Sequence, residues 1–245
     1  MTTLRDRLAA VEEKIEAACK RCGRSRGEVR LMAVSKTHPA SAIVEAMQAG
    51  ITLFGENRVQ EFERKSTELT AQGVPVRAAA GNSGIEVHLI GHLQSNKAAK
   101  TAQLFSAVDT LDSLRLAERL HDAASRQGSV LPVLLEIKLS TEEAKTGLDP
   151  DGAELREILD RAPGLAHLQI RGLMTVAPFD NNPNTARACF RQLRELRNRL
   201  AQSHPQLDLS ELSMGMSGDF EIGIEEGSTL IRIGTALFGA REART

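Results

Sequence analysis

The sequence predicts a closed (β/α)8 barrel, because strand-like and helical patterns alternate along the chain. Eight short apolar runs of strand length occur over about 220 residues, with stretches of helical periodicity between them. Such alternation is typical of a parallel sheet covered by helices, and eight repeats are the number that closes a barrel. A doubly wound open sheet shows the same alternation, so the periodicity alone leaves that arrangement as the alternative.

The predicted elements follow one another in a regular order. A helix over 4–18 opens the chain, with Thr3 and Asp6 at the spacing of a capping box. The eight predicted strands are 29–34, 51–54, 87–90, 104–108, 130–137, 168–176, 207–212 and 229–233, and Gly55 is expected to end the second. Further helices are predicted over 39–49, after Gly55, and over 96–103, 113–126, 152–161 and 190–200. The Ala- and Gly-rich stretch 71–84 is predicted as a mobile surface loop, and 1–245 as a single domain.

Composition and charge argue against several classes of protein. Lys and Arg number 31 against 32 Asp and Glu, so a net charge of −1 provides no excess of cations to neutralise nucleic-acid phosphates. No apolar run reaches the roughly 18 residues of a membrane span, and the charged start of the chain is unlike a signal peptide. Three cysteines form no disulfide scaffold, and Cys19 and Cys22 lack a second pair for zinc. We therefore expect a cytoplasmic protein without a metal, a membrane or a nucleic acid as partner.

The carboxyl ends of the strands are where the active sites of such barrels lie. Lys36 directly follows the first predicted strand, where partial burial favours the neutral amine. A neutral amine can attack an aldehyde and form a Schiff base. Taken alone, a lysine at the end of a strand is more often an ordinary surface residue.

The turns after the last two strands have the features of a phosphate-binding site. Gly218 and Gly234 let the backbone approach an anion closely, and the amides and hydroxyls of Ser217 and Thr235 can donate to it. Barrels commonly hold a phosphate at these two turns, although each alone resembles an ordinary helix N-cap. Together with Lys36 across the mouth, they favour a ligand with both an aldehyde and a phosphate. Pyridoxal 5′-phosphate fits this description, and a Schiff-base aldolase acting on a sugar phosphate would need the same groups.

Six short blocks distributed along the chain form a specific combination. They are AVSKT at 33–37, FGEN at 54–57, GHLQSNK at 91–97, RGLM at 171–174, MGMS at 214–217 and IRIGTALFG at 231–239. In this order they resemble the pyridoxal phosphate homeostasis protein family over essentially the whole chain. The resemblance implies a barrel similar to the N-terminal domain of alanine racemase, which is fold type III among pyridoxal phosphate proteins.

The resemblance also implies a cofactor, pyridoxal 5′-phosphate, and the residues that hold it. The implied positions are Lys36 for an aldimine with the aldehyde, Ser217, Gly218, Gly234 and Thr235 for the phosphate, Arg232 for the pyridine nitrogen, and Asn57 and Met174 for the ring side of the pocket. The implied function is intracellular homeostasis of vitamin B6, in which the protein sequesters the cofactor and delivers it. Apo forms of pyridoxal phosphate enzymes would then be the recipients.

Two features favour a binding protein over an enzyme. An arginine only donates hydrogen bonds, so Arg232 would leave the ring nitrogen unprotonated and weaken the ring as an electron sink. Related racemases use a tyrosine from an additional domain as second base, and this chain has no tyrosine. Two alternatives stay open, an amino-acid enzyme with weak racemase or lyase activity and a Schiff-base aldolase on a phosphorylated substrate. Glu136 and Lys138 share one strand face and would serve such an aldolase if that face is the inner one.

Some features stay unassigned at this point. Lys138 and Lys145, near the end of the fifth predicted strand, could accept a second aldehyde. Several arginines make the helix over 185–202 basic, and a solvated face is the preferred interpretation. Because no apolar feature demands a dimer, we expect a monomer.

Overall fold

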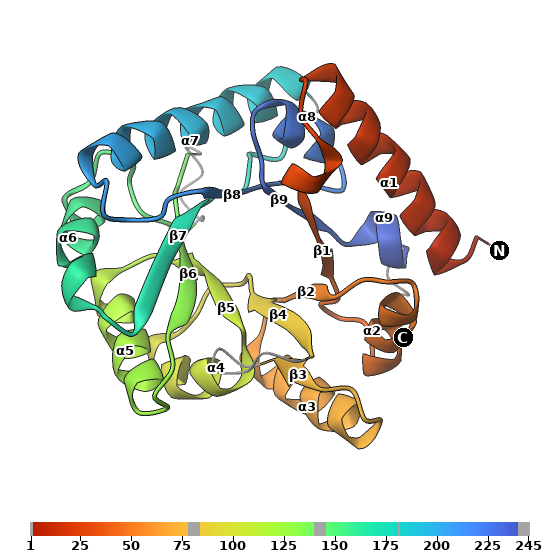
Figure 1. The fold of residues 1–245 in the computed structure, drawn as a ribbon, viewed down its shortest axis with the longest axis horizontal. Coiled ribbons are helices and arrows are strands. Elements are labelled where there is room, and N and C mark those ends of the chain that lie inside the picture. The colour runs from red at the N-terminus through yellow and green to blue at the C-terminus, as the bar shows by residue number, and fades with distance from the viewer. Residues whose placement is uncertain (1, 78–83, 140–145, 181, 240–245) are drawn as a thin grey trace.

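The computed structural model of the protein describes residues 2–77, 84–139, 146–180 and 182–239. Its centre is a ring of parallel strands, namely β1 (Arg30–Val34), β2 (Leu53–Glu56), β4 (Ile85–Leu89), β5 (Ala107–Leu111), β6 (Leu131–Glu136), β7 (Leu168–Met174), β8 (Glu211–Met216) and β9 (Leu230–Ile233). Pairing of β1 with β9 and of β2 with β4 closes the ring (Figure 1). The predicted eight-stranded barrel is therefore confirmed, and the open sheet is excluded.

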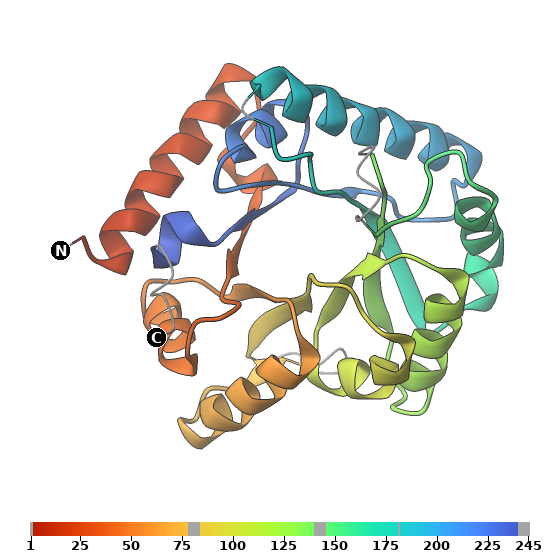
Figure 2. The ribbon, with the colours of Figure 1, turned by 180° about the vertical axis from the view of Figure 1, so that it is seen from behind.

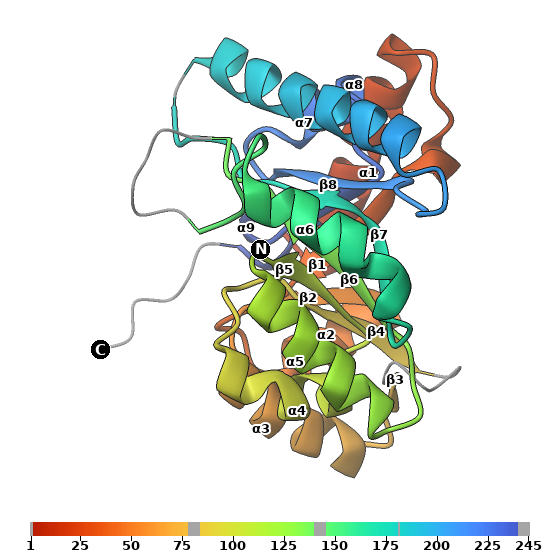
Figure 3. The ribbon, with the colours of Figure 1, turned by 90° about the vertical axis from the view of Figure 1, so that its left-hand side faces the viewer.

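Helices surround the ring of strands, as Figures 1 and 2 show from the two ends and Figure 3 from the side. They are α1 (Leu4–Arg21), α2 (Ala40–Gln48), α3 (Val59–Ala71), α4 (Ala98–Leu104), α5 (Leu114–Ser125), α6 (Ala153–Arg161), α7 (Pro183–Ser203), α8 (Phe220–Glu225) and α9 (Thr235–Phe238), with short 3₁₀ turns η1 (Arg26–Glu28), η2 (Ser95–Lys97) and η3 (Ala162–Gly164). In the part of the chain described, none of these helices combines the length and the apolar character that crossing a membrane requires.

The first helix begins where the sequence predicts it. The Thr3 hydroxyl accepts from the Asp6 amide, and the Asp6 carboxylate accepts from the Thr3 amide, at 3.2 and 2.9 Å. This reciprocal capping satisfies N–H groups that have no partner inside the helix. The buried face of α1 includes Val11 and Ile15 and packs against α8 and α9.

Strand alternation separates two kinds of packing. On β1, Ala33 belongs to the large apolar core between strands and helices, whereas Met32 packs with Leu53 and Leu230 in a small cluster inside the ring. Successive side chains of a strand point to opposite faces, so residues in phase with Met32 face the barrel interior. The apolar inner layer is small, which leaves room for polar groups at both ends of the barrel.

Some predicted strand boundaries are wrong. The strand predicted over 104–108 lies at Ala107–Leu111, because Leu104 still belongs to α4. The strand predicted over 207–212 lies at Glu211–Met216, so Met214 and Gly215 are in the strand and not in the turn after it. Gly55 lies inside β2 and does not end it. A Cβ at Gly55 would lie 2.7 Å from the sulfur of Met32, so glycine makes room for that inner side chain.

The stretch predicted as a loop over 71–84 contains regular structure. Ala71 is the last residue of α3, and β3 (Val76–Arg77) adds to the outside of β4 by parallel pairing. Residues 78–83 lie outside the described residues. The prediction of a mobile surface loop over this stretch stays a prediction.

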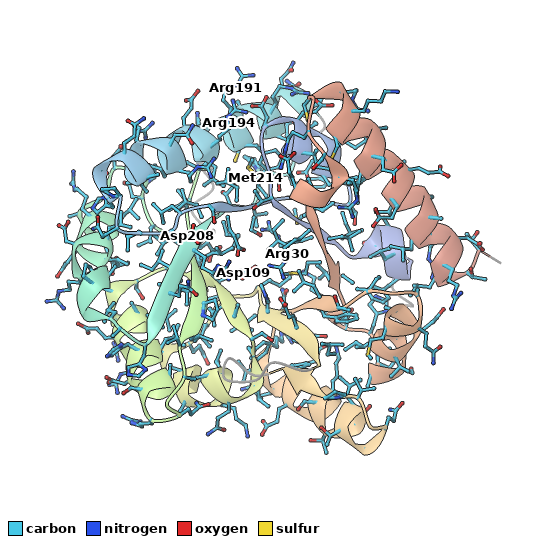
Figure 4. All side chains as sticks on the ribbon, viewed as in Figure 1. Arg30, Asp109, Arg191, Arg194, Asp208 and Met214 are labelled. Atoms are coloured by element: carbon cyan, nitrogen blue, oxygen red, sulfur yellow. The ribbon has the colours of Figure 1, made fainter. Side chains whose placement is uncertain are left out.

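The basic helix α7 is bound to α8 through a shared carboxylate. Arg187, Arg191 and Arg194 lie 3.1, 3.2 and 3.1 Å from the carboxylate of Glu226, whose side chain is only 5% exposed. Figure 4 shows Arg191 and Arg194 on the outer helix α7, away from the barrel interior. The three arginine side chains are 34–52% exposed, so this face of α7 is partly solvated and at the same time fastens α7 to the end of α8.

Candidate cofactor-binding site

The residues predicted to form the site lie at the carboxyl ends of their strands, hence at one end of the barrel. Lys36 lies in the turn after β1, Asn57 directly after β2, Met174 at the end of β7, Ser217 and Gly218 directly after β8, Arg232 within β9, Gly234 between β9 and α9, and Thr235 at the start of α9. The fold thus brings together residues from five strands that are up to about 200 positions apart in the sequence.

Lys36 occupies a constrained turn. It is half-buried and lies two residues beyond Val34, which is in phase with Met32 and faces the interior. The preceding residue, Ser35, points the other way and donates to the Glu56 carboxylate at 2.7 Å. The following residue, Thr37, has a φ of +67°, a left-handed conformation that is unusual for a β-branched residue. The Lys36 turn is therefore held in a specific conformation from both sides.

Backbone N–H groups converge beside Ser217. The Ser217 hydroxyl oxygen accepts from the amides of Gly234 and Ala236 at 3.3 and 3.4 Å, which links the turns after β8 and β9. Gly218 adjoins this point, and a Cβ placed there would meet no atom within 4 Å. Hydroxyl, amide donors and open space at one position are what an anion such as a phosphate requires.

Arg232 is buried inside the barrel, with 4% of its surface exposed. Its guanidinium donates to the carbonyl and hydroxyl oxygens of Ser213 at 3.0 and 2.6 Å and to the carbonyl of Thr175 at 2.8 Å. Burial lowers the pKa of Arg232, while the charges of Asp109, Asp219 and Glu136 oppose this. The neutral acceptors fix the direction of the guanidinium and leave its positive charge without a directly bonded carboxylate in the described part of the chain.

Two carboxyl groups near Arg232 were not predicted as part of the site. Burial raises the pKa of Asp219, which accepts from the Met216 amide at 2.6 Å. Burial and the neighbouring charge of Asp112 raise the pKa of Glu136, and its second carboxylate oxygen is buried without a hydrogen-bond partner among the residues that the structure describes. Sequence reasoning considered Glu136 only for an aldolase. Its β6 neighbours Leu135 and Ile137 pack in the outer core, so Glu136 lies on the inner face.

Asn57 contributes an unsatisfied acceptor. Its side-chain oxygen is buried and has no hydrogen-bond partner among the described residues. The loop after β4 passes so close that a Cβ at Gly91 would lie 2.3 Å from the Asn57 carbonyl oxygen. Gly91 is therefore required for the close approach of this loop, and the loop in turn restrains the Asn57 backbone.

A second polar cluster occupies the opposite, N-terminal end of the barrel interior. There His88 lies 3.0 Å from Asp109, and Arg30 lies 2.6 Å from Glu86, around a cavity of about 40 Å³. Figure 4 shows Arg30 and Asp109 inside the ring of strands. Although burial disfavours the charged imidazole, the charge and hydrogen bond of Asp109 raise the pKa of His88 to about 9. No role for this pair could be predicted from the sequence, because only the fold brings the two residues together.

Of the two lysines left unassigned, Lys138 lies just beyond β6. It is half-buried, and its amide donates to the Leu148 carbonyl at 2.9 Å. Lys145 lies outside the described residues. The structure thus leaves the second aldehyde site untested.

Comparison with known proteins is consistent with this geometry. Residues 7–242 match the family model of the alanine racemase N-terminal domain. A pyridoxal phosphate homeostasis protein of Escherichia coli is 42% identical over 242 residues, covering 99% of this chain and 98% of that one. Its counterpart in Haemophilus influenzae is also 42% identical, over 97% of this chain and 96% of the relative.

Solved structures agree with the sequence comparison. PipY of Synechococcus elongatus with PLP bound superposes with a TM-score of 0.82 at 41% identity, covering 97% of this chain and all of that chain. An alanine racemase of Clostridium difficile has the same barrel at 14% identity and a TM-score of 0.67, with 58% of its chain covered. The chain therefore belongs to the pyridoxal phosphate homeostasis protein family, which is built on the barrel of the alanine racemase N-terminal domain.

Proposed function

We propose that this protein binds pyridoxal 5′-phosphate at the carboxyl end of its barrel and serves vitamin B6 homeostasis. The observation that carries the proposal is the placement of Lys36 at the same barrel end as the Ser217, Gly234 and Ala236 groups. The Lys36 amine would hold the aldehyde of the cofactor, and those donors would hold its phosphate. The relative whose structure holds PLP is 41% identical, and the family name points the same way.

The residues present fit this cofactor. The unpartnered side-chain oxygen of Asn57 is an acceptor in need of a donor, and the space beside Gly218 admits a bulky anion. Arg232 would direct a guanidinium N–H at the pyridine nitrogen, and Met174 would line the ring. In this proposal the chain is a single cofactor-binding domain. The residues that hold the cofactor are Lys36, Asn57, Met174, Ser217, Gly218, Arg232, Gly234 and Thr235.

The proposed task is holding and delivery rather than turnover. Bound cofactor supplies an electron sink for amino-acid chemistry, and that sink is strongest when the ring nitrogen is protonated. Arg232 keeps its proton and donates, so it works against ring protonation. The chain has no tyrosine to act as the second base of a racemase. We therefore infer a cytoplasmic, monomeric carrier that sequesters the cofactor and transfers it to apo-enzymes.

One observation favours a second candidate, slow racemase or lyase activity. Glu136 lies on the inner face with a raised pKa, and one of its oxygens has no partner in the described part of the chain, so it could exchange a proton at this end of the barrel. A panel of amino acids incubated with loaded protein distinguishes the two functions. Many fast turnovers per chain would favour the enzyme, whereas loss of amino-acid conversion in Glu136→Gln would identify the base.

Cofactor absorbance tests the proposed binding. The chain has neither Trp nor Tyr, so the near-ultraviolet and visible bands of the cofactor are easily resolved. After incubation with pyridoxal phosphate and removal of the free cofactor by gel filtration, we expect wild-type protein to be yellow and Lys36→Ala to be colourless. Lys100→Ala is the matched control, because Lys100 is a partly exposed lysine on α4 that pairs with Glu63. A yellow Lys36→Ala protein would overturn the assignment.

A further inference from the structure

A second lysine, Lys65 on α3, lies buried behind the turn that carries Lys36. Its side chain is 8% exposed, and its ammonium contacts three oxygens. These are the Ser35 carbonyl at 2.9 Å, the Glu56 carboxylate at 2.7 Å and the Glu61 carboxylate at 2.8 Å. A lysine ammonium has three N–H donors, so these contacts use its full capacity.

The two carboxylates extend this network to both neighbours of Lys36. The Glu56 oxygen that contacts Lys65 also accepts from the Ser35 hydroxyl at 2.7 Å. Likewise, the Glu61 oxygen that contacts Lys65 accepts from the backbone amide of Thr37 at 2.6 Å. The residue before Lys36 and the residue after it are therefore both bonded to groups that converge on one buried ammonium.

The ionisation of Glu61 and Glu56 favours their contacts with Lys65. Burial acts to raise the pKa of Glu61, but hydrogen bonds from Lys65 and from the Thr37 amide outweigh it and lower that pKa. Glu61 is therefore an ionised acceptor, which forms a stronger bond to an amide than a neutral group does. Burial raises the pKa of Glu56, whose stable ionisation consequently depends on Lys65.

The backbone of Thr37 shows why such a restraint is needed. Its φ of +67° lies in the left-handed region, which a β-branched residue enters only when its surroundings impose it. Two bonds hold this conformation, that of the Thr37 amide to Glu61 and that of the His38 amide to the Ser35 carbonyl at 3.1 Å. Without the bond to Glu61 we expect the turn to relax and the Lys36 amine to move with it.

We propose that Lys65, Glu56 and Glu61 form a positioning clamp for the Lys36 amine. The three residues act through the backbone on either side of Lys36 and do not touch the ligand themselves. The inference rests on the proposed function, since it assigns Lys36 as the amine that receives the aldehyde. Removing two carboxylates and an ammonium from water is unfavourable, and a plain ion pair would need only one carboxylate. The second carboxylate, that of Glu61, is explained by its role in positioning the backbone of Thr37.

Matched alanine variants on α3 test the clamp. Glu61→Ala removes the acceptor of the Thr37 amide, and Glu68→Ala makes the same change at an exposed position of the same helix. Each protein is titrated with pyridoxal phosphate and with 4-deoxypyridoxine 5′-phosphate, which has the phosphate but no aldehyde. For Glu61→Ala we expect roughly 5- to 30-fold weaker binding of the aldehyde ligand, equivalent to the usual left-handed penalty of about 1–2 kcal/mol. Binding of the analogue should be unchanged, and Glu68→Ala should match wild type with both ligands.

A ligand-free measurement and a rescue variant complete the test. Hydrogen exchange at the Thr37 amide should be slow in wild type and in Glu68→Ala, and faster in Glu61→Ala. Adding Thr37→Gly to Glu61→Ala should restore part of the affinity, because glycine adopts a positive φ without strain. If Glu61→Ala does not fold, Glu61→Gln keeps the shape and a neutral acceptor, and we expect an intermediate loss of affinity for the aldehyde ligand.

The outcomes separate the clamp from the proposed function. If Glu61→Ala binds both ligands as wild type does, the clamp is refuted while cofactor binding stands. Equal weakening for both ligands would also refute it, since it would show a general loss of structure. If wild-type protein binds neither ligand, the proposed function itself is contradicted, and the clamp with it.

Discussion

At the scale of single residues, Arg232 shows how the barrel treats a buried charge. Buried arginines are usually neutralised by a carboxylate at bonding distance. Arg232 instead donates to oxygens of Ser213 and Thr175, and the carboxylates of Asp109, Asp219 and Glu136 act on it through space. The guanidinium is thereby fixed in direction while its positive charge stays available to a ligand.

Replacing Arg232 should therefore destabilise the protein. Arg232→Met removes the donor of the buried Thr175 carbonyl and of the Ser213 hydroxyl oxygen, and we expect a loss of about 2–4 kcal/mol in the free energy of unfolding. Urea unfolding followed by circular dichroism measures it, because the chain has no Trp. Arg191→Met is the control, since Arg191 is half exposed and Glu226 keeps Arg187 and Arg194. A change of about 1 kcal/mol or less is expected there, and equal losses in the two variants would contradict the account.

At the scale of elements, the sequence predicts a strand well where an apolar run stands alone. The runs at β1, β6 and β9 are bounded by polar or helix-forming residues, and their predicted ends differ little from the observed ones. Around β5 and β8 the apolar residues continue from the preceding segment, as with Leu104 in α4 and Leu209 before β8. Periodicity cannot separate buried segments that follow one another without a break. The predicted positions of both strands are therefore shifted along the sequence from the observed ones.

The same distinction applies to the site. Lys36 and the two glycine-containing turns are local features, so the sequence shows them directly. The clamp is different, because Glu61 and Lys65 are four apart on a helix and resemble an ordinary surface ion pair. Lys65 is buried only because α3 packs behind β1 and β2, which brings it to Ser35, 30 positions away. The long-range partners of such a pair come from the fold alone.

The contact between the loops after β2 and β4 gives a test at this scale. Gly91→Ala would place a Cβ 2.3 Å from the Asn57 carbonyl, so the two loops must separate. We expect a loss of about 1–3 kcal/mol in stability and weaker cofactor binding by titration, because Asn57 shifts with its loop. Gly164→Ala in η3 is the matched control, with no atom within 4 Å of the new Cβ. Wild-type behaviour of Gly91→Ala would show that the loops are not constrained as described.

At the scale of the whole molecule, the two ends of the barrel interior hold different polar groups. The carboxyl end carries the candidate site, and the N-terminal end carries the charged cluster around His88, Asp109, Arg30 and Glu86. In barrels of this class the N-terminal end generally serves stability. The raised pKa of His88, about 9, makes that contribution depend on pH.

Stability should consequently fall as the pH rises. His88 holds its proton in the folded state up to about pH 9 and loses it near 6.5 when unfolded. Its contribution, on the order of 3 kcal/mol, is present in full below pH 6.5 and is lost as the pH approaches 9. Urea unfolding between pH 6 and 9.5 measures this, and His88→Gln should flatten the profile over that range. An equally steep profile in the variant would assign the effect to other groups.

The central claim is that Lys36 is the amine that carries the cofactor, and reduction with borohydride tests it most directly. Wild-type protein is incubated with pyridoxal phosphate, reduced, digested and mapped by mass spectrometry. The account predicts one dominant pyridoxyl-phosphate label, on the peptide that contains Lys36, at stoichiometric cofactor. A dominant label on Lys138, Lys145 or any other lysine, with Lys36 unmodified, would contradict it.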